Sequence, residues 1–208
     1  MPQLTIVECE QGTPEWFAAR RGRPSASNFG TVLAKGKTEG AKSITREKYL
    51  YELAGEILTE ESAESYSNGH MERGKALEQE ARDLYAFMRN VEPVRVGYGH
   101  IVKAGASPDS LIDANGGLEI KTALPPILFG HIVADRPPPE HLPQVQGNIW
   151  VFGREWWDLV IYWPKLPLFV KRIYRDEAYI KRLEAEVDRF NEELFAFTER
   201  MRRYGEAA

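Results

Sequence analysis

The segment SPDSLIDANGGLEIKTA, residues 107–123, places two acidic residues and a lysine around a glycine-containing turn. Asp109 follows a proline, Glu119 lies ten positions later, and Lys121 is two positions further along. On either side of Asn115-Gly116-Gly117, the runs SLIDA and GLEIKTA have the length and composition of β-strands. The segment therefore predicts a β-hairpin that carries charged side chains in otherwise apolar surroundings.

The register of this hairpin decides which charged side chains meet. Side chains alternate along a strand, so Glu119 and Lys121 share one face about 6.6 Å apart. A two-residue Asn-Gly turn would place Asp109 opposite Thr122, on the other face. A three-residue loop, or a bulge at one of the glycines, places Asp109 opposite Lys121 or one pair removed. We expect the odd-length loop, which brings the three charged groups together.

Two converging carboxylates would form an oxygen-rich site suited to Mg²⁺, which prefers one or two carboxylates together with water and substrate phosphate. The ammonium group of Lys121 can hold or help deprotonate an attacking water and offset charge in the transition state. The alternative is a structural hairpin in which Glu119 simply pairs with Lys121 at the surface. Zinc is not expected, since the histidines at 70, 100, 131 and 141 lack metal-ligand spacing.

Composition and charge set broad limits on the protein. The chain has 208 residues and a net charge of −4, so we expect a single domain. We also expect it to be soluble and cytoplasmic, because it has neither a long apolar run nor a basic leader followed by an apolar stretch. Cys9 is the only cysteine, which excludes an internal disulfide. Residues 20–48 carry a net charge of +6 and residues 52–80 a net charge of −6, so one face can still attract phosphate.

Hydrophobic periodicity predicts an α/β (α+β) fold with a central mixed β-sheet flanked by helices. We divide the expected single domain, residues 1–208, into a helical N-terminal part (about 1–90), a core (about 91–175) and a C-terminal helix (about 176–203). Within these parts, helices are expected at 43–61, 74–88, 142–152 and 180–201, and strands at 91–105, 110–114, 117–123, 156–163 and 168–174. The C-terminal helix has a heptad-like apolar stripe, which we expect to pack on the sheet rather than to form a subunit interface.

Four segments in order resemble a known enzyme family. Pro108-Asp109 followed by Glu119-x-Lys121 resembles the PD-(D/E)xK nuclease superfamily. The stretches RRGRPSASNFGTVLAKG, GKALEQEARDLY, ASPDSLIDANGGLEIKT and LPQVQGNIWVFGREWWDLVIYWP together are similar to the lambda exonuclease or YqaJ-type viral alkaline exonuclease family. The resemblance runs from about Trp16 to Tyr179 and implies a restriction-endonuclease-like core with a nuclease site.

The resemblance implies a Mg²⁺-dependent 5′-to-3′ exonuclease, with Mn²⁺ as a possible substitute and two ions per active site. It would degrade one strand of linear double-stranded DNA and leave 3′ overhangs for recombination by strand annealing. The implied metal ligands are Asp109, Glu119 and the backbone carbonyl of Ile120, with Lys121 positioning the water. Glu78, Gln144 and Gln146 are implied as supporting catalytic residues. Alternatively, Glu78 pairs with Lys75 or Arg82, and the glutamines cap the following helix.

The resemblance also implies how DNA is held. Arg20, Ser27 and Ser107 correspond to residues that bind the 5′-phosphate, and Met71 to an apolar wedge that parts the last base pairs. Arg20 is alternatively one more surface cation. Family members form a homotrimer ring and work beside a single-strand annealing protein in bacterial or phage-infected cells, and both partners are expected here.

Two other functions stay open on sequence grounds. A restriction-type endonuclease would use the same two carboxylates and lysine for phosphodiester cleavage. A non-catalytic protein that binds DNA ends would need the basic segment alone.

Overall fold

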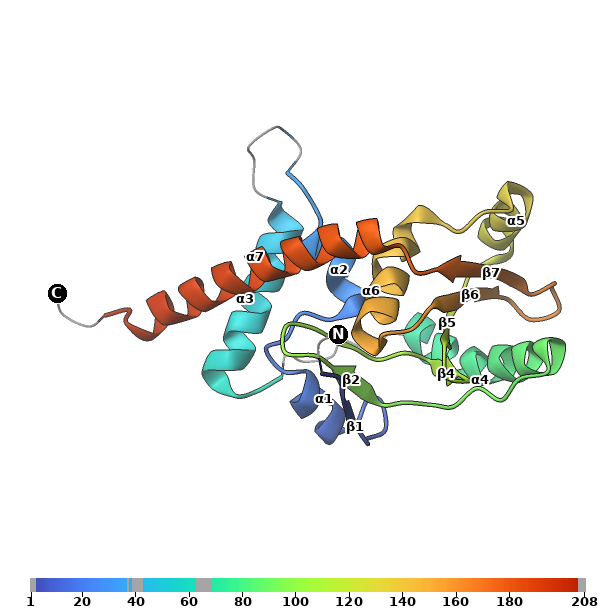
Figure 1. Ribbon diagram of the computed structural model, residues 1–208, viewed down its shortest axis with the longest axis horizontal. Helices are drawn as coiled ribbons and strands as arrows, with labels where there is room; N and C mark the ends of the chain where they lie inside the picture. The colour runs from blue at the N-terminus through green and yellow to red at the C-terminus, as the bar shows by residue number, and fades with distance from the viewer. Residues whose placement is uncertain (1–2, 37, 39–42, 63–68, 206–208) are drawn as a thin grey trace.

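The computed structural model describes residues 3–36, 38, 43–62 and 69–205, without the side chains of 69–73 and 75. A four-stranded sheet lies between helices, and a smaller three-stranded sheet lies beside α1 (Figure 1). In chain order the elements are β1 (Thr5–Val7), α1 (Pro14–Arg20), α2 (Phe29–Val32), α3 (Ile44–Thr59), α4 (Gly69–Arg89), β2 (Tyr98–His100), β3 (Gly105–Ala106), β4 (Ser110–Ile112), β5 (Gly116–Thr122), α5 (Pro125–Ala134), α6 (Leu142–Phe152), β6 (Trp156–Tyr162), β7 (Phe169–Tyr174) and α7 (Glu177–Arg202), with 3-10 turns at Ala26–Asn28 and Pro139–His141.

The larger sheet is mixed, as predicted. Its order is β4-β5-β6-β7, with β5 and β6 parallel and the two outer pairs antiparallel. Parallel neighbours need a long crossover connection. Here that connection carries α5 and α6, so the predicted helix at 142–152 lies directly over the sheet.

The small sheet, β1-β2-β3, was not expected as a separate unit. β1 lies in the part of the chain predicted to be helical, and it pairs with β2, more than 90 residues later. A three-residue strand that is largely exposed carries too short a pattern to be recognised from sequence. Its partner determines the strand, and that partner is remote in the chain.

The two faces of the larger sheet pack against different helices. Leu118 and Ile120 of β5 belong to a cluster with Ala81 and Tyr85 of α4. Leu159 and Ile161 of β6 belong instead to the main core, which includes residues of α6 and α7. Because Glu119 pairs with Leu159, it lies on the α6 face of β5.

α7 buries its apolar stripe, but not against the sheet. Residues Ile180, Leu183, Val187, Phe190 and Leu194 are buried, and α7 packs mainly on α3 and α6. The Phe190 ring stacks on Tyr49 of α3, with centroids 5.5 Å apart. The expected packing of this helix on the sheet is therefore wrong, because α6 already occupies that face. No helix in the described ranges is long and apolar enough to cross a membrane.

A buried charged network fixes α4 to the sheet. Asp158 of β6 is fully buried and accepts two hydrogen bonds from Arg172 of β7, both at 2.9 Å. The hydroxyl of Tyr85 donates to the same carboxylate at 2.7 Å. Burial and the hydrogen bond to Asp158 raise the pKa of Tyr85 far above its usual range. The Arg172 guanidinium also lies 3.5 Å from the Trp156 ring centroid, which holds it in place.

Tyr85→Phe tests this network. It removes one donor from a buried carboxylate while Arg172 stays, so we expect the free energy of unfolding to fall by about 1.5–3 kcal/mol. Urea denaturation monitored by circular dichroism measures the change. Tyr174→Phe is the matched control, since Tyr174 is largely exposed. Equal midpoints for both variants would contradict the proposed role of the Asp158 network in stability.

Candidate active site

The β4–β5 hairpin has the odd-length loop that the sequence predicts. Ser110 pairs with Leu118 and Ile112 with Gly116, which leaves residues 113–115 as a three-residue loop. One pair further along, Asp109 comes opposite Glu119. The backbone N–H of Ile120 donates to Oδ2 of Asp109 at 2.5 Å. The register thus places both carboxylates on one face.

Two glycines allow the hairpin to pack under tryptophans. A Cβ at Gly116 would lie 2.1 Å from a ring carbon of Trp156, and a Cβ at Gly117 would lie 2.3 Å from a ring carbon of Trp157. Neither distance is possible for a side chain, so these positions require glycine. The Asn-Gly-Gly sequence therefore serves close packing against β6 as well as the turn.

Glu119 is surrounded by donors, with only 3% of its surface exposed. The Lys121 ammonium lies 2.7 Å from its Oε1, and Nε2 of Gln144 donates to the same oxygen at 2.6 Å. Nδ2 of Asn148 donates to Oε2 at 3.0 Å. The predicted residues Lys121 and Gln144 are thus brought to Glu119, and Asn148 joins them.

Gln146 lies elsewhere. Its Nε2 donates to the Tyr174 carbonyl at 2.8 Å, and its Oε1 accepts from the Asp176 amide at 3.1 Å. In the structure it therefore links β7 to the start of α7 rather than contacting Glu119. Positions two apart on a helix lie about 200° from each other, whereas positions four apart share a face. The spacing of Gln144 and Asn148 in α6 is the signal that would have identified Asn148.

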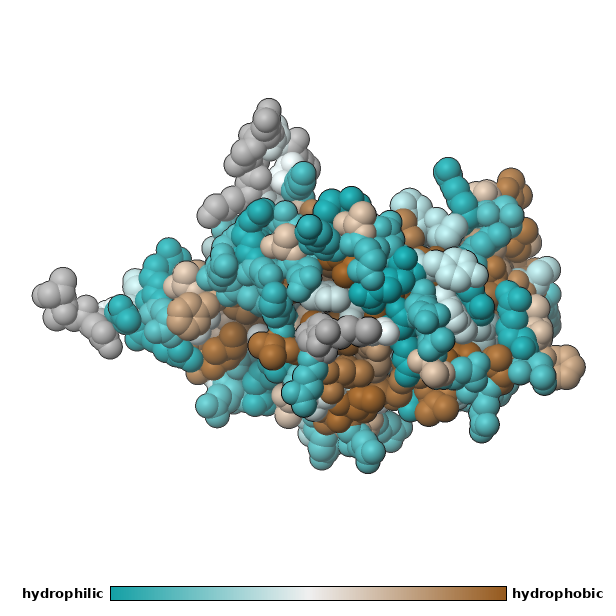
Figure 2. All heavy atoms as spheres, viewed as in Figure 1, coloured by the Kyte–Doolittle hydropathy of each residue, from teal (hydrophilic) through white to brown (hydrophobic). Residues whose placement is uncertain are grey.

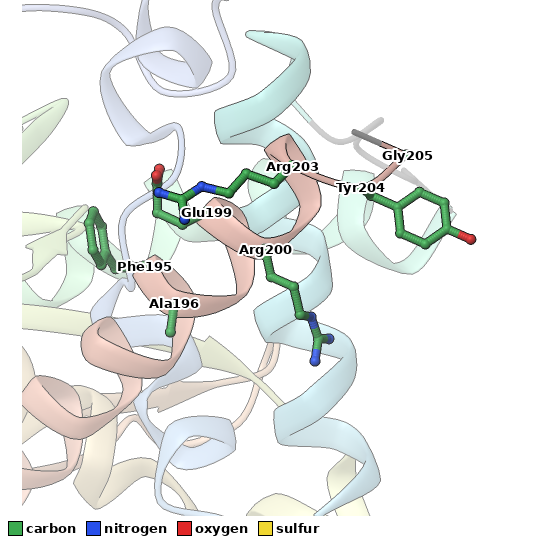
Figure 3. A pocket seen from close by; sticks show the side chains of 7 residues that line it. All are labelled: Phe195, Ala196, Glu199, Arg200, Arg203, Tyr204 and Gly205. Carbon is green, nitrogen blue, oxygen red and sulfur yellow. The ribbon is translucent and has the colours of Figure 1, made fainter. Parts of the chain in front are cut away.

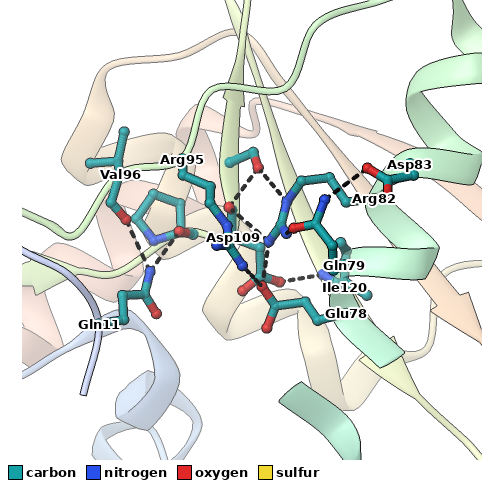
Figure 4. A network of polar contacts seen from close by, with 11 residues as sticks. Gln11, Glu78, Gln79, Arg82, Asp83, Arg95, Val96, Asp109 and Ile120 are labelled. Carbon is teal, nitrogen blue, oxygen red and sulfur yellow. Dashed lines mark hydrogen bonds and ion pairs between the residues drawn. The ribbon is translucent and has the colours of Figure 1, made fainter. Parts of the chain in front are cut away.

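Glu78 approaches the site from α4 (Figure 4). Its Oε1 forms an ion pair with Nη2 of Arg82, which is 4% exposed. Arg82 also donates to the Asp109 carbonyl at 3.3 Å and to Oγ of Ser110 at 3.0 Å. Arg95 lies 3.9 Å from the same Glu78 oxygen. Glu78 is therefore paired with Arg82, which is one of the two alternatives for this residue, and its charge also acts on Asp109. Its supporting role in catalysis stays a prediction.

The carboxylates repel one another in this buried position. Burial raises the pKa of Asp109 well above its usual range, and the charges of Glu119 and Glu78 raise it further. The Ile120 N–H and Lys121 act in the opposite direction. For Lys121, burial lowers the pKa, but Glu119, Asp109 and Glu78 outweigh burial, so that the pKa of this ammonium lies above its ordinary value. The lysine stays charged at physiological pH, and a divalent cation would relieve the remaining repulsion.

The donor set fits magnesium better than zinc. Over the described ranges, no group of three or more His, Cys, Asp or Glu side chains is arranged to hold a metal ion. The acidic side chains that meet here are those of Asp109 and Glu119, and the Ile120 carbonyl stays a predicted ligand. Mg²⁺ keeps several waters and binds through one or two carboxylates, so a pair of acids is sufficient. Structural zinc sites need four nitrogen or sulfur ligands, which this pair does not supply.

The three residues predicted to bind a 5′-phosphate also come together. Nη1 of Arg20 donates to Oγ of Ser107 at 2.9 Å, and Nη2 donates to Oγ of Ser25 at 3.3 Å. The hydroxyl of Ser27 lies 3.1 Å from that of Ser25. Ser25, which sequence reasoning missed, links Arg20 to Ser27. We refer to Arg20, Ser25, Ser27 and Ser107 as the arginine–serine cluster.

Trp16 and Gln11 support this cluster and its link to Asp109. The Arg20 guanidinium carbon lies 4.1 Å from the Trp16 ring centroid, and Nε1 of Trp16 donates to Oγ of Ser107 at 2.9 Å. Nε2 of Gln11 donates to the carbonyls of Val96 and Pro108, both at 3.0 Å (Figure 4). Since Ser107 precedes Asp109 by two residues, the arginine–serine cluster directly adjoins the carboxylates.

Met71 is the one predicted site residue whose side chain lies outside the described part of the chain. Its backbone belongs to the first turn of α4. The wedge role therefore stays a prediction.

A surface depression elsewhere has no share in this arrangement. At the C-terminal end of α7, a hollow of about 680 Å³ lies between Phe195 and Gly205 (Figure 3). It contains none of the predicted site residues and is formed by one helix and the residues that follow it.

Comparisons with known proteins identify the family and the fold of the chain. Residues 15–155 match the model of the YqaJ-like viral recombinase domain. LHK-Exo in complex with dAMP has a TM-score of 0.83 and 36% identity, covering 92% of this chain and 97% of that one. Another structure, the alkaline exonuclease LHK-Exo from Laribacter hongkongensis, has a TM-score of 0.82 and 35% identity, and the match covers the same 92% and 97% of the two chains. A phage-related exonuclease from Haemophilus somnus 129PT has a TM-score of 0.60 and 14% identity, and the match covers 86% of this chain and 96% of that one. At this low identity the match shows a shared fold only. No curated protein sequence matches the chain.

Asp109→Asn should stabilise the metal-free protein. The pKa of Asp109 is raised by folding, so protonation favours the folded state and the charged form destabilises it as pH rises. In EDTA at pH 8, the variant should melt above the wild type, by about 2–4 °C for each kcal/mol gained. The difference should shrink as pH is lowered. Differential scanning calorimetry measures it.

Asp113→Asn is the control for this experiment, because Asp113 lies exposed in the loop of the same hairpin. It should leave the melting temperature unchanged. An Asp109→Asn variant that melts below the wild type at pH 8 would show that the carboxylates do not repel one another.

Proposed function

The chain belongs to the YqaJ-like viral recombinase family and is a DNA exonuclease, and from this premise we propose its substrate end, polarity and cofactor. It digests one strand of linear duplex DNA in the 5′-to-3′ direction, uses Mg²⁺ and leaves 3′ single-stranded overhangs for strand annealing. The observation that carries this proposal is the convergence of Asp109, Glu119 and Lys121 beside the arginine–serine cluster.

The proposed ligands of the divalent ion are Asp109, Glu119 and the Ile120 carbonyl. When bound, Mg²⁺ supplies Lewis-acid polarisation of the phosphate oxygen and neutralises developing charge. Two ions per site and replacement by Mn²⁺ are part of the proposal. Its support is the position of Asp109, where burial first, and then the charges of Glu119 and Glu78, hold the pKa of this carboxyl well above its ordinary value.

Lys121 is proposed to position the attacking water. The Lys121 side chain is 31% exposed and its ammonium lies 2.7 Å from Oε1 of Glu119, so it can contact solvent and a bound phosphate together. Its positive charge also offsets the negative charge that develops on the phosphate in the transition state. Gln144, on the same oxygen of Glu119, and Glu78, beside Asp109, are proposed to support this arrangement.

The arginine–serine cluster is proposed to bind the terminal 5′-phosphate. A guanidinium fork with adjacent hydroxyl donors matches the geometry of a phosphate. A nucleotide bound to LHK-Exo, dAMP, is consistent with a site that handles 5′-nucleotides in this family. Because Ser107 and Asp109 lie two residues apart, a phosphate held at one site would place a neighbouring phosphodiester near the other.

Further parts of the proposal concern the assembly of subunits and partners. A homotrimer ring would cover apolar surface such as that on α5, where Leu124, Ile127, Phe129 and Val133 are exposed. Apolar residues gather at that end of the face shown in Figure 2. An annealing protein as partner, Met71 as the wedge, Gln146 as a catalytic residue and the division of a single domain at about 90 and 175 stay predictions.

The main test uses linear duplex DNA with 5′-phosphate or 5′-hydroxyl ends, each strand labelled separately, with and without Mg²⁺. We expect mononucleotides to be released from the 5′ end of the labelled strand, faster degradation of phosphorylated ends, and no product in EDTA. Release of nucleotides from the 3′ end first would contradict the polarity. Cleavage of a covalently closed plasmid would instead indicate a restriction-type endonuclease.

Arg20→Gln tests end recognition. Loss of a charged hydrogen bond to phosphate costs about 1.5–3 kcal/mol, so degradation of phosphorylated ends should slow by roughly 10- to 100-fold. Hydroxyl ends should be affected little, and the preference between ends should disappear. Lys181→Gln removes an exposed cation from α7 and should leave the preference intact. An Arg20→Gln variant that keeps the wild-type preference would remove the cluster from the proposed mechanism.

A further inference from the structure

Asn148 is more deeply buried than any other polar contact of Glu119. It lies in the middle of α6 with 1% of its surface exposed, and its Nδ2 donates to Oε2 of Glu119 at 3.0 Å. A carboxylate only accepts hydrogen bonds, so the orientation of the amide is fixed by Glu119. Its other atom, Oδ1, is buried and has no hydrogen-bond partner among the described residues.

The two oxygens of Glu119 differ in what holds them. Oε1 is held by Lys121 and Gln144, which both reach the solvent side of the site. Among the described residues, Asn148 is the one side chain that donates to Oε2, and it is buried. If Oε2 left this contact, the Nδ2 group would also be buried without a partner, at an added cost of about 1–3 kcal/mol.

We propose that Asn148 is a positioning residue. Its amide holds Oε2 of Glu119 by a hydrogen bond, so that only Oε1 is left to bind the divalent ion. The inference rests on the proposed metal-dependent function and specifies how Glu119 takes part in it. One-oxygen ligation leaves room for the waters that Mg²⁺ retains, among them the one that attacks the phosphate. Groups that orient a metal ligand typically change metal affinity or activity by about 10- to 100-fold when removed.

Asn148→Leu is the most direct variant, because leucine has the same branched shape without polar atoms. It removes the unpaired Oδ1 and also one donor to the buried Glu119 carboxylate, so the free energy of unfolding in EDTA should fall by about 1.5–3 kcal/mol while the protein still folds. We expect the affinity for Mn²⁺, measured by isothermal titration calorimetry on metal-free protein, to fall about 10- to 100-fold. The Mg²⁺ concentration needed for half-maximal cleavage should rise in parallel.

Asn191→Leu is the matched control. Asn191 lies on α7, away from Glu119, and its side-chain amide donates to the Lys103 carbonyl. It should leave Mn²⁺ affinity unchanged. A residue needed only for folding would lower the melting temperature in EDTA without changing metal affinity. Should Asn148→Leu fail to fold, Asn148→Ala provides the same measurement with a smaller side chain.

The outcomes separate the inference from the proposed function. A folded Asn148→Leu protein that binds Mn²⁺ within about twofold of the wild type overturns the inference, while wild-type cleavage leaves the exonuclease proposal standing. Wild-type protein that neither binds Mn²⁺ nor cleaves DNA overturns both. A crystal structure with Mn²⁺ that shows Oε1 bound in the wild type, and both oxygens or Oε2 bound in the variant, supports the inference directly.

Discussion

Two carboxylates, that of the partly buried Asp109 and that of the buried Glu119, face each other across the β4–β5 hairpin, and the surrounding residues offset part of their repulsion. Charge repulsion is strong where water is excluded, so each oxygen needs a donor or a cation. The Ile120 amide serves Asp109, while Lys121 and two side chains of α6 serve Glu119. The site is therefore under electrostatic strain until a cation enters, which suits a metal-dependent reaction.

The helices on the two faces of the sheet contribute in different ways. α6 presents Gln144 and Asn148, one turn apart, to the two oxygens of Glu119. α4 presents Glu78 and Arg82 to the edge where Asp109 lies, and it is fixed to the sheet by the Asp158 network. The same sheet therefore carries both the stabilising Asp158 network and the residues of the proposed site. A loss of packing between α4 and β6 would displace a residue of the site as well as weaken the fold.

The proposed end-binding and cleavage sites are joined by three residues of chain. Ser107 contacts Arg20 and Trp16 from the N-terminal part, Pro108 is held through its carbonyl by Gln11, and Asp109 belongs to the carboxylate pair. The N-terminal segment is in turn anchored by the pairing of β1 with β2. Any shift of this segment would alter the distance between the phosphate group and the carboxylates, so the small sheet has a functional reason to be rigid.

The sequence alone determined the chemistry that is confined to short stretches of chain. The turn left two registers open, and the odd-length loop was expected because it brings Asp109 beside Glu119 and Lys121. The period of two placed Glu119 and Lys121 on one face, and the helical period located α3, α4 and α7. These are local properties, fixed by backbone geometry within a few residues.

Only the tertiary structure decided which residues from different elements meet. The role of Asn148 depends on how α6 lies over β5. The contact of Ser25 with Arg20 depends on how the N-terminal segment approaches Ser107. The helices against which α7 packs depend on which surface α6 leaves uncovered. Local patterns contain no information on such distances, because the packing of remote segments is set by the shape and burial of the whole core.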